Sequence, residues 1–254
     1  MSAPVLVVLA VLGLVGGVGI TAVGPGGVLP TIGLFALSGL APPTVAGTAI
    51  VTHVATGLLG SAAYLRSGQL RDPQTRRSAL HLAVWAAVGA PVGTLVNALV
   101  TGRVFGVLLG AFVALVGVTV LFRERHLRER PSPSTGSRSG VVLSLVGFAV
   151  GAVSAMFGVG GPMLTVPLLV ILGMPMLPAL AAAQVQSVVI ATVGSAGYLA
   201  QGAISWPLAA LIGIPELCGV LVGWRIAHAL PTRALTFALV IALFAVAPYL
   251  AFQP

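Results

Sequence analysis

Charged side chains are scarce in this sequence: only 6% of its 254 residues are Asp, Glu, Lys or Arg, while 58% are hydrophobic. A water-soluble domain carries about 25% charged residues and needs them to cover its surface. The shortage excludes an ordinary soluble protein and predicts a chain surrounded by a lipid bilayer. Lysine is absent altogether, so the formal net charge of +8 rests on twelve arginines.

Cysteine and aspartate occur once each, as Cys218 and Asp72. A single cysteine excludes an intrachain disulfide and a cysteine-based metal centre, and a single aspartate excludes an aspartyl dyad. The sequence also lacks a nucleotide-binding P-loop, so we expect no direct use of ATP. Ser195 has no histidine in its segment to act as a base for a hydrolase. We therefore expect neither enzyme activity nor a cofactor.

Long apolar runs fill most of the chain, and they are long enough to cross a bilayer, which takes ~20 residues. Their polarity does not alternate, as the strands of a membrane barrel would require. We therefore predict an all-α integral membrane protein. The runs are 3–23, 79–101, 103–122, 140–157, 178–200, 206–223 and 234–252.

The sequence repeats itself with an offset of 134 residues. Without a gap, 24–68 aligns with 158–202, and fifteen of the 45 aligned positions are identical. Apolar segments share leucines easily, but they seldom share glycines and a Gly-Ser-Ala-x-Tyr-Leu string in register, so we predict an internal duplication. We expect two membrane units of about four to five transmembrane segments each, 1–122 and 140–254, joined by an exposed polar linker at 123–139.

Each copy contains a glycine-rich turn, at 24–27 or 158–161. A short apolar segment follows each turn, 28–40 or 162–173, and a proline-rich break comes before the next long helix. These segments are shorter than the ~30 Å hydrocarbon core. They are therefore either short helices or re-entrant halves.

Arginines predict the orientation of the chain. The loop at 66–77 and the linker at 123–139 contain four and five arginines, respectively, which favours the cytoplasmic side. The repeat counterpart of the loop, 200–211, is uncharged and is expected outside. We therefore predict an inverted-topology repeat in a bacterial inner membrane with both termini outside. Since topology accounts for the arginines, we expect no nucleic-acid partner.

Interrupted helices in inverted repeats meet near the bilayer midplane, where free backbone N–H groups and helix N-termini attract anions. The two glycine turns are candidates for such a site, with close helix packing through small residues as the alternative. Polar side chains in the following helices are candidates for the same site. The full candidate substrate-binding set is Gly26, Gly27, Thr52, His53, Gly160, Gly161, Gln184, Gln186 and Ser187.

Three ionisable residues in apolar sequence are candidates for coupling or anion attraction. An imidazole titrates near neutrality, so His53 is a candidate carrier of a coupling proton. Glu216 is expected either at the outer rim or in a proton relay. Arg225 is expected to extend to the membrane interface, with anion binding as the alternative.

Two strings resemble the sulfite exporter TauE/SafE family of bacterial membrane transporters. They are GPGGVLPTIGLFALSGLAPPTVAGTAIVTHVATGLLGSAAYLRSG and GVGGPMLTVPLLVILGMPMLPALAAAQVQSVVIATVGSAGYLAQGAISW. The stretch CGVLVGWRIAHALPTRAL resembles the family's Gly-x-x-x-Gly-x-Arg segment, although the first copy has Leu95 at the position of Arg225. The resemblance implies a multi-pass plasma-membrane protein that moves sulfite, thiosulfate, sulfoacetate or related organic acids, usually outward. His53 is not carried over from the family pattern.

A channel-like pore for small anions or neutral solutes is the alternative function. The sequence contains no ring of charges that would set the selectivity of such a pore. Uphill flux that depends on a proton gradient or on voltage would separate a secondary transporter from a channel.

Overall fold

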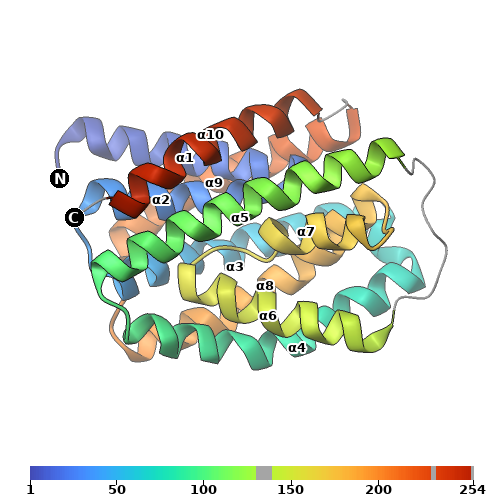
Figure 1. Ribbon diagram of the computed structural model, residues 1–254, viewed down its shortest axis with the longest axis horizontal. Coiled ribbons are helices and arrows are strands. Elements are labelled where there is room, and N and C mark those ends of the chain that lie inside the picture. Colours follow the sequence, from blue (N-terminus) through green and yellow to red (C-terminus); the bar gives the residue numbers. More distant parts are fainter. Residues whose placement is uncertain (130–138, 230–232, 253–254) are drawn as a thin grey trace.

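The computed structural model describes residues 1–129, 139–229 and 233–252, and every regular element in this part of the chain is a helix (Figure 1). The prediction of an all-α protein is therefore confirmed. Seven of the described helices, α1, α3, α4, α5, α6, α8 and α9, are long and apolar enough to cross a membrane. The elements are α1 Ala3–Ala22, η1 Pro25–Gly27, α2 Val28–Ser38, α3 Pro42–Arg66, η2 Gln69–Arg71, α4 Pro73–Ala98, α5 Gly102–Glu129, α6 Gly140–Phe157, α7 Pro162–Ile171, α8 Met176–Ala200, α9 Trp206–Ala229 and α10 Arg233–Phe252.

Prolines and glycines set the boundaries of these helices. Pro42, Pro73 and Pro162 are the first residues of α3, α4 and α7, where the missing amide costs no intrahelical hydrogen bond. Gly39 and Gly158 end α2 and α6 in the left-handed conformation, with φ of 67° and 71°. A side chain there would be strained, so these two turns need glycine.

The short apolar segments that follow the glycine turns form helices of half the usual length. Helix α2 covers 11 residues and α7 covers 10, which corresponds to about 15 Å. Neither is long enough to cross the membrane alone. Both segments are helical, as both alternatives for them require.

Glycines allow α1 to lie directly on the backbone of α9. A Cβ added at Gly13 would lie 2.5 Å from the carbonyl oxygen of Ile212, and one at Gly17 would lie 2.1 Å from that of Glu216. Both distances are below any normal Cβ contact, so only glycine permits this packing. Interfaces of small residues are the usual way in which membrane helices approach closely.

The repeat counterparts of α1 and α9, which are α6 and α4, pack against each other in the same way. A Cβ added at Gly147 would lie 2.8 Å from the carbonyl oxygen of Leu82, and one at Gly151 would lie 2.6 Å from that of Ala86. Gly147 and Gly151 follow Gly13 and Gly17 at the repeat offset of 134. Gly17 contacts the backbone of Glu216, and its counterpart Gly151 contacts the backbone of Ala86. Ala86 in the first copy therefore corresponds to Glu216 in the second.

The two shared tyrosines form equivalent hydrogen bonds. The hydroxyl of Tyr64 donates to the carbonyl oxygen of Thr21 at 2.8 Å, and that of Tyr198 donates to the carbonyl oxygen of Ala155 at 2.9 Å. Donors and acceptors are both related by the offset of 134 residues. Each tyrosine thus joins the end of its long helix to the helix before the glycine turn of its own unit.

Repeat counterparts lie at opposite ends of the bundle. Figure 1 places the α3–α4 loop and the end of α5 at one end, and the two chain termini together with the α8–α9 loop at the other. This arrangement is compatible with the predicted inverted repeat.

Helix α5 continues to Glu129, so the segment predicted to be a linker begins inside a helix. Arg123 is 1% exposed, and its guanidinium donates to the carbonyl oxygen of Val23 at 2.9 Å and to Oε1 of Glu124 at 2.8 Å. The expectation of an exposed linker is therefore wrong for Arg123 and Glu124, because α10 packs along α5 and the Arg123 guanidinium reaches Val23 and Thr236. Residues 130–138 of the predicted linker lie outside the described residues.

Candidate functional site

The two glycine turns meet at a single buried side chain, the imidazole of His53 on α3. A Cβ added at Gly27 would lie 3.1 Å from Cε1 of His53, and one added at Gly160 would lie 3.6 Å from its Cγ. His53 is 1% exposed. Because Gly27 and Gly160 have no side chains, the backbones of both turns lie directly against the ring.

Helices α2 and α7 begin at these two turns. Helix α2 starts at Val28, directly after Gly27, and α7 starts at Pro162, directly after Gly161. The N-terminus of a helix carries partial positive charge and backbone N–H groups without intrahelical partners. Two such ends, one from each repeat unit, therefore lie beside His53.

A buried carboxyl group, that of Glu216 on α9, faces His53. Oε1 of Glu216 lies 3.4 Å from Nδ1 of His53, and Glu216 is 0% exposed. Oγ1 of Thr52 lies 2.5 Å from Oε2 of Glu216 and 2.8 Å from the carbonyl oxygen of Ala49. Of the two alternatives for Glu216, the outer rim is wrong, because α9 packs this residue into the bundle against α3.

Residues of α8 form the other side of the same region. Oγ of Ser187 lies 2.8 Å from a Cβ added at Gly160, and the amide of Gln186 lies near Gly161. Thr165, on α7, donates to Oε1 of Gln186 at 2.5 Å. This bond leaves Nε2 of Gln186 as a buried donor with no partner in the described part of the chain.

Two of the candidate residues, Gly26 and Gln184, contact neighbouring helices instead of His53. A Cβ added at Gly26 would lie 2.4 Å from the carbonyl oxygen of Gly16, so Gly26 packs against α1. The side chain of Gln184 lies against Gly60 of α3, and its Nε2 is 3.5 Å from the carbonyl oxygen of Ile20. At these two positions the contacts are those of helix packing.

Of the candidate ionisable residues, Arg225 is not part of this cluster. It is exposed near the end of α9, as expected for a side chain that extends to the interface. Arg123, which the sequence predicts to lie in the linker, has a buried side chain instead. Its hydrogen bond to Val23 places it directly before Gly24, the first residue of the glycine turn.

Several buried polar atoms around the glycine turns have no hydrogen-bond partner within the described residues. They are Nε2 of His53, Nε2 of Gln186 and Oε1 of Glu216, the last of which has Nδ1 of His53 as a polar neighbour at 3.4 Å. Buried polar groups are normally hydrogen-bonded, so a group without a partner needs an explanation. Their convergence from α3, α8 and α9 is typical of a site that receives a polar guest.

A family model described as Sulfite exporter TauE/SafE matches residues 9–250 of the chain. The match covers both glycine turns and all the helices that surround His53. No curated protein and no solved structure matches the chain.

Proposed function

Because the chain belongs to the sulfite exporter TauE/SafE family, we propose that it is a secondary transporter that exports small sulfur-containing anions across the bacterial inner membrane. The family is one of membrane transporters for sulfur-related anions. Sulfite, thiosulfate, sulfoacetate and related organic acids are the proposed substrates. The linker end of the bundle is proposed to face the cytoplasm and the two termini the outside.

One observation carries the proposal for the binding site: Gly27 and Gly160, from the two repeat units, approach the same imidazole. An oxyanion between the turns would meet backbone N–H groups and the positive ends of α2 and α7. The hydroxyl of Ser187 and the free Nε2 of Gln186 supply neutral donors beside it. Neutral donors suit a transporter, because a permanently paired cation would hold the anion too tightly for release.

The proposed coupling ion is a proton carried by Glu216 and His53. The hydroxyl of Thr52 has one hydrogen but two oxygen neighbours, the carbonyl of Ala49 and the carboxyl of Glu216. The carbonyl can only accept, so both contacts are hydrogen bonds only if Glu216 is protonated and donates to Thr52. Nδ1 of His53 lies 3.4 Å from the other carboxyl oxygen, Oε1, and receives the proton when the carboxyl group carries it on that oxygen instead of on Oε2.

This acid–base pair also favours a transporter over the channel-like alternative. An open pore needs no proton-accepting groups at its centre, whereas coupled transport requires a group whose protonation changes during the cycle. Glu216 and His53 are the ionisable groups at this position. The helices against α9 here are α1 and α3, and α1 contributes no ionisable side chain.

Flux measurements with the purified protein in proteoliposomes test this function. We expect labelled sulfite or thiosulfate to accumulate against its own gradient when a pH gradient is imposed, while chloride does not. Dissipation of anion gradients without accumulation would indicate the channel. Absence of flux for every sulfur oxyanion, sulfonate and carboxylate tried would refute the proposal.

A further inference from the structure

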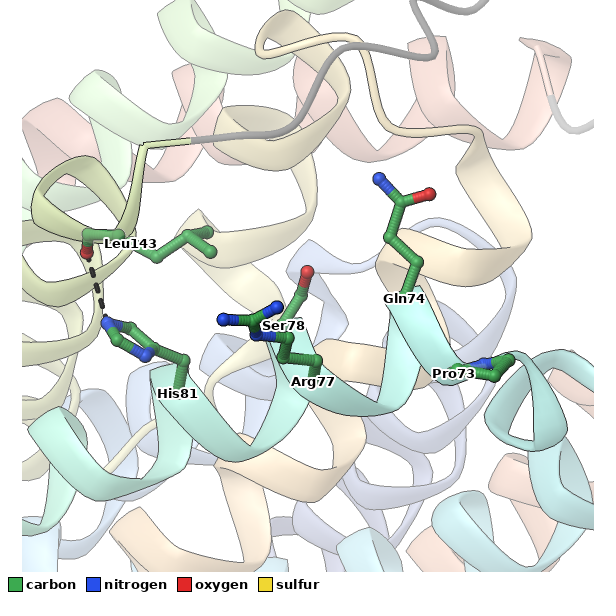
Figure 2. Close-up of a pocket in the computed structure, with 7 residues that line it drawn as sticks. Pro73, Gln74, Arg77, Ser78, His81 and Leu143 are labelled. Carbon is green, nitrogen blue, oxygen red and sulfur yellow. Dashed lines mark hydrogen bonds between the residues drawn. The ribbon is translucent and has the colours of Figure 1, made fainter.

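A second region of the molecule, separate from the glycine turns, forms a polar hollow of about 480 Å³ between the first turns of α4 and α6 (Figure 2). It lies at the end of the bundle that carries the α3–α4 loop. None of the residues that line it belongs to the region around His53. The lining residues are Pro73, Gln74, Arg77, Ser78, His81, Gly140 and Leu143.

The polar lining residues of α4 share one face of the helix. Gln74, Arg77, Ser78 and His81 are spaced so that their side chains lie on neighbouring turns, and Figure 2 shows them along the same side of α4. Ser78 is 6% exposed, yet its hydroxyl has no hydrogen-bond partner among the described residues. Arg77 is exposed and forms no ion pair with any described residue. Both groups are therefore available to a ligand.

His81 forms the inner edge of the hollow. Its Nε2 lies 3.0 Å from the carbonyl oxygen of Gly140 and 2.9 Å from Oγ of Ser144. A carbonyl can only accept, so Nε2 carries a hydrogen and donates it towards α6. These contacts hold the imidazole between the two helices, and Nδ1 lies on the other side of the ring.

No carboxyl group is among the lining residues of this hollow, and Arg77 supplies a guanidinium. The nearest acid along the chain, Asp72, accepts from the backbone N–H and the hydroxyl of Thr75, each at 2.7 Å. The N-terminus of α6 adds partial positive charge at the same place, whereas the carboxylate of Asp72 offsets that of α4. The hollow therefore fits an anion with several oxygen acceptors.

Apolar side chains beyond the hollow indicate where that anion comes from. Leu80 and Val84 on α4 are 54% and 63% exposed, and Val141 and Leu145 on α6 are 68% and 65% exposed. In a membrane-spanning chain such residues face lipid tails, so the first turns of both helices lie at the level of the headgroups. Basic pockets between membrane helices at this level bind anionic lipid headgroups.

We propose that the hollow binds the phosphate group of an anionic phospholipid, with the guanidinium of Arg77 and the hydroxyl of Ser78 as its ligands. The guanidinium matches phosphate geometry with two parallel N–H donors. The acyl chains of the lipid would follow the apolar surfaces of α4 and α6. This site does not depend on which anion the protein transports.

Native mass spectrometry of the full-length protein tests the site with phosphatidylglycerol, phosphatidylcholine and inorganic phosphate as separate probes. We expect phosphatidylglycerol to bind in preference to phosphatidylcholine. Arg77→Gln should weaken phosphatidylglycerol binding about five-fold, the effect of one arginine at an anionic lipid surface, and Ser78→Ala should weaken it as well. Arg76→Gln is the matched control, because Arg76 is an exposed neighbour on α4 that does not line the hollow.

Three other results would overturn or reassign the lipid site. Equal losses in Arg76→Gln and Arg77→Gln would reduce the effect to general surface charge and overturn the proposal, as would equal binding of the two lipids. Displacement of phosphatidylglycerol by millimolar inorganic phosphate would keep the phosphate site but assign it to a soluble ion.

Discussion

Nδ1 of His53 on α3 lies 3.4 Å from Oε1 of Glu216 on α9, and both residues are fully buried. The two helices belong to different repeat units, so this contact joins the halves of the duplicated chain. The repeat counterpart of His53 is Ser187, and that of Glu216 is Ala86. The duplicated scaffold therefore carries its acid–base pair on one side only, while the opposite side supplies neutral donors.

We expect Gly160→Ala to weaken anion binding. The added methyl would lie 2.8 Å from Oγ of Ser187, so it would occupy space beside the proposed anion and displace one of its donors. The predicted loss is roughly ten-fold in Kd, equivalent to about 1.4 kcal/mol, measured by titration of purified protein with sulfite or thiosulfate. Gly102→Ala is the control, because nothing lies within 4 Å of its added Cβ. Equal affinities in both variants would remove the turn from the site.

Tyr64→Phe and Tyr198→Phe should destabilise the protein to a similar extent. Each removes one buried hydrogen bond, to Thr21 or to Ala155, which is worth about 1 kcal/mol. Thermal unfolding in detergent measures the two changes. A large effect of one substitution and none of the other would show that the two units do not use these bonds equivalently.

Much of the fold could be predicted from the sequence, because a chain in lipid must satisfy its own backbone hydrogen bonds. Long apolar runs must become helices, and the glycine turns at 24–27 and 158–161, shared in register, indicated a plan of elements that recurs in both units. The burial of Arg123 could not be predicted, because an arginine at the end of an apolar run has the same local pattern as a topology signal. Tertiary contacts explain its position: the guanidinium reaches the carbonyl oxygen of Val23 after α1 and the hydroxyl of Thr236 on α10.

Arg123→Leu should destabilise the protein far more than Arg125→Leu. Arg123 is buried and joins Val23 to Glu124, whereas Arg125 on the same helix is exposed. Loss of one partner from a buried ion pair costs about 3 kcal/mol or more, since the other partner remains without compensation. Unfolding temperatures of the two variants in the same detergent provide the comparison, and equal values would contradict the structural role of Arg123.

Acid should weaken the start of α4 through Asp72. Hydrogen bonds from the side chain and backbone of Thr75 hold the pKa of Asp72 below its ordinary value, which is about 3.9. The stabilisation is therefore complete above that value and is lost as pH falls through the lower pKa of the folded state. Unfolding temperatures measured across this acid range should decline less in Asp72→Asn than in the wild type. Parallel declines in both proteins would show that the cap does not contribute.

The candidate site was predicted in part, for a physical reason. Four residues of the site could be predicted because polar side chains inside a membrane cost free energy unless they are paired or functional, and because glycines mark turns. They are Gly27, His53, Gly160 and Ser187. The inner position of Glu216 could not be selected, because it depends on which face of α9 packs against α3. That face is set by tertiary contacts such as the one between Gly17 and the backbone of α9, which no local pattern reports.

Proton-driven flux in proteoliposomes that contain wild-type protein or Glu216→Gln tests the proposed mechanism most directly. The wild type should accumulate sulfite and thiosulfate when a pH gradient is imposed. Glu216→Gln should lose this accumulation yet still exchange labelled for unlabelled anion, because the glycine turns and Ser187 remain in place. The surface variant Asp72→Asn should behave like the wild type. Accumulation by Glu216→Gln equal to that of the wild type would contradict proton transfer through Glu216 and His53.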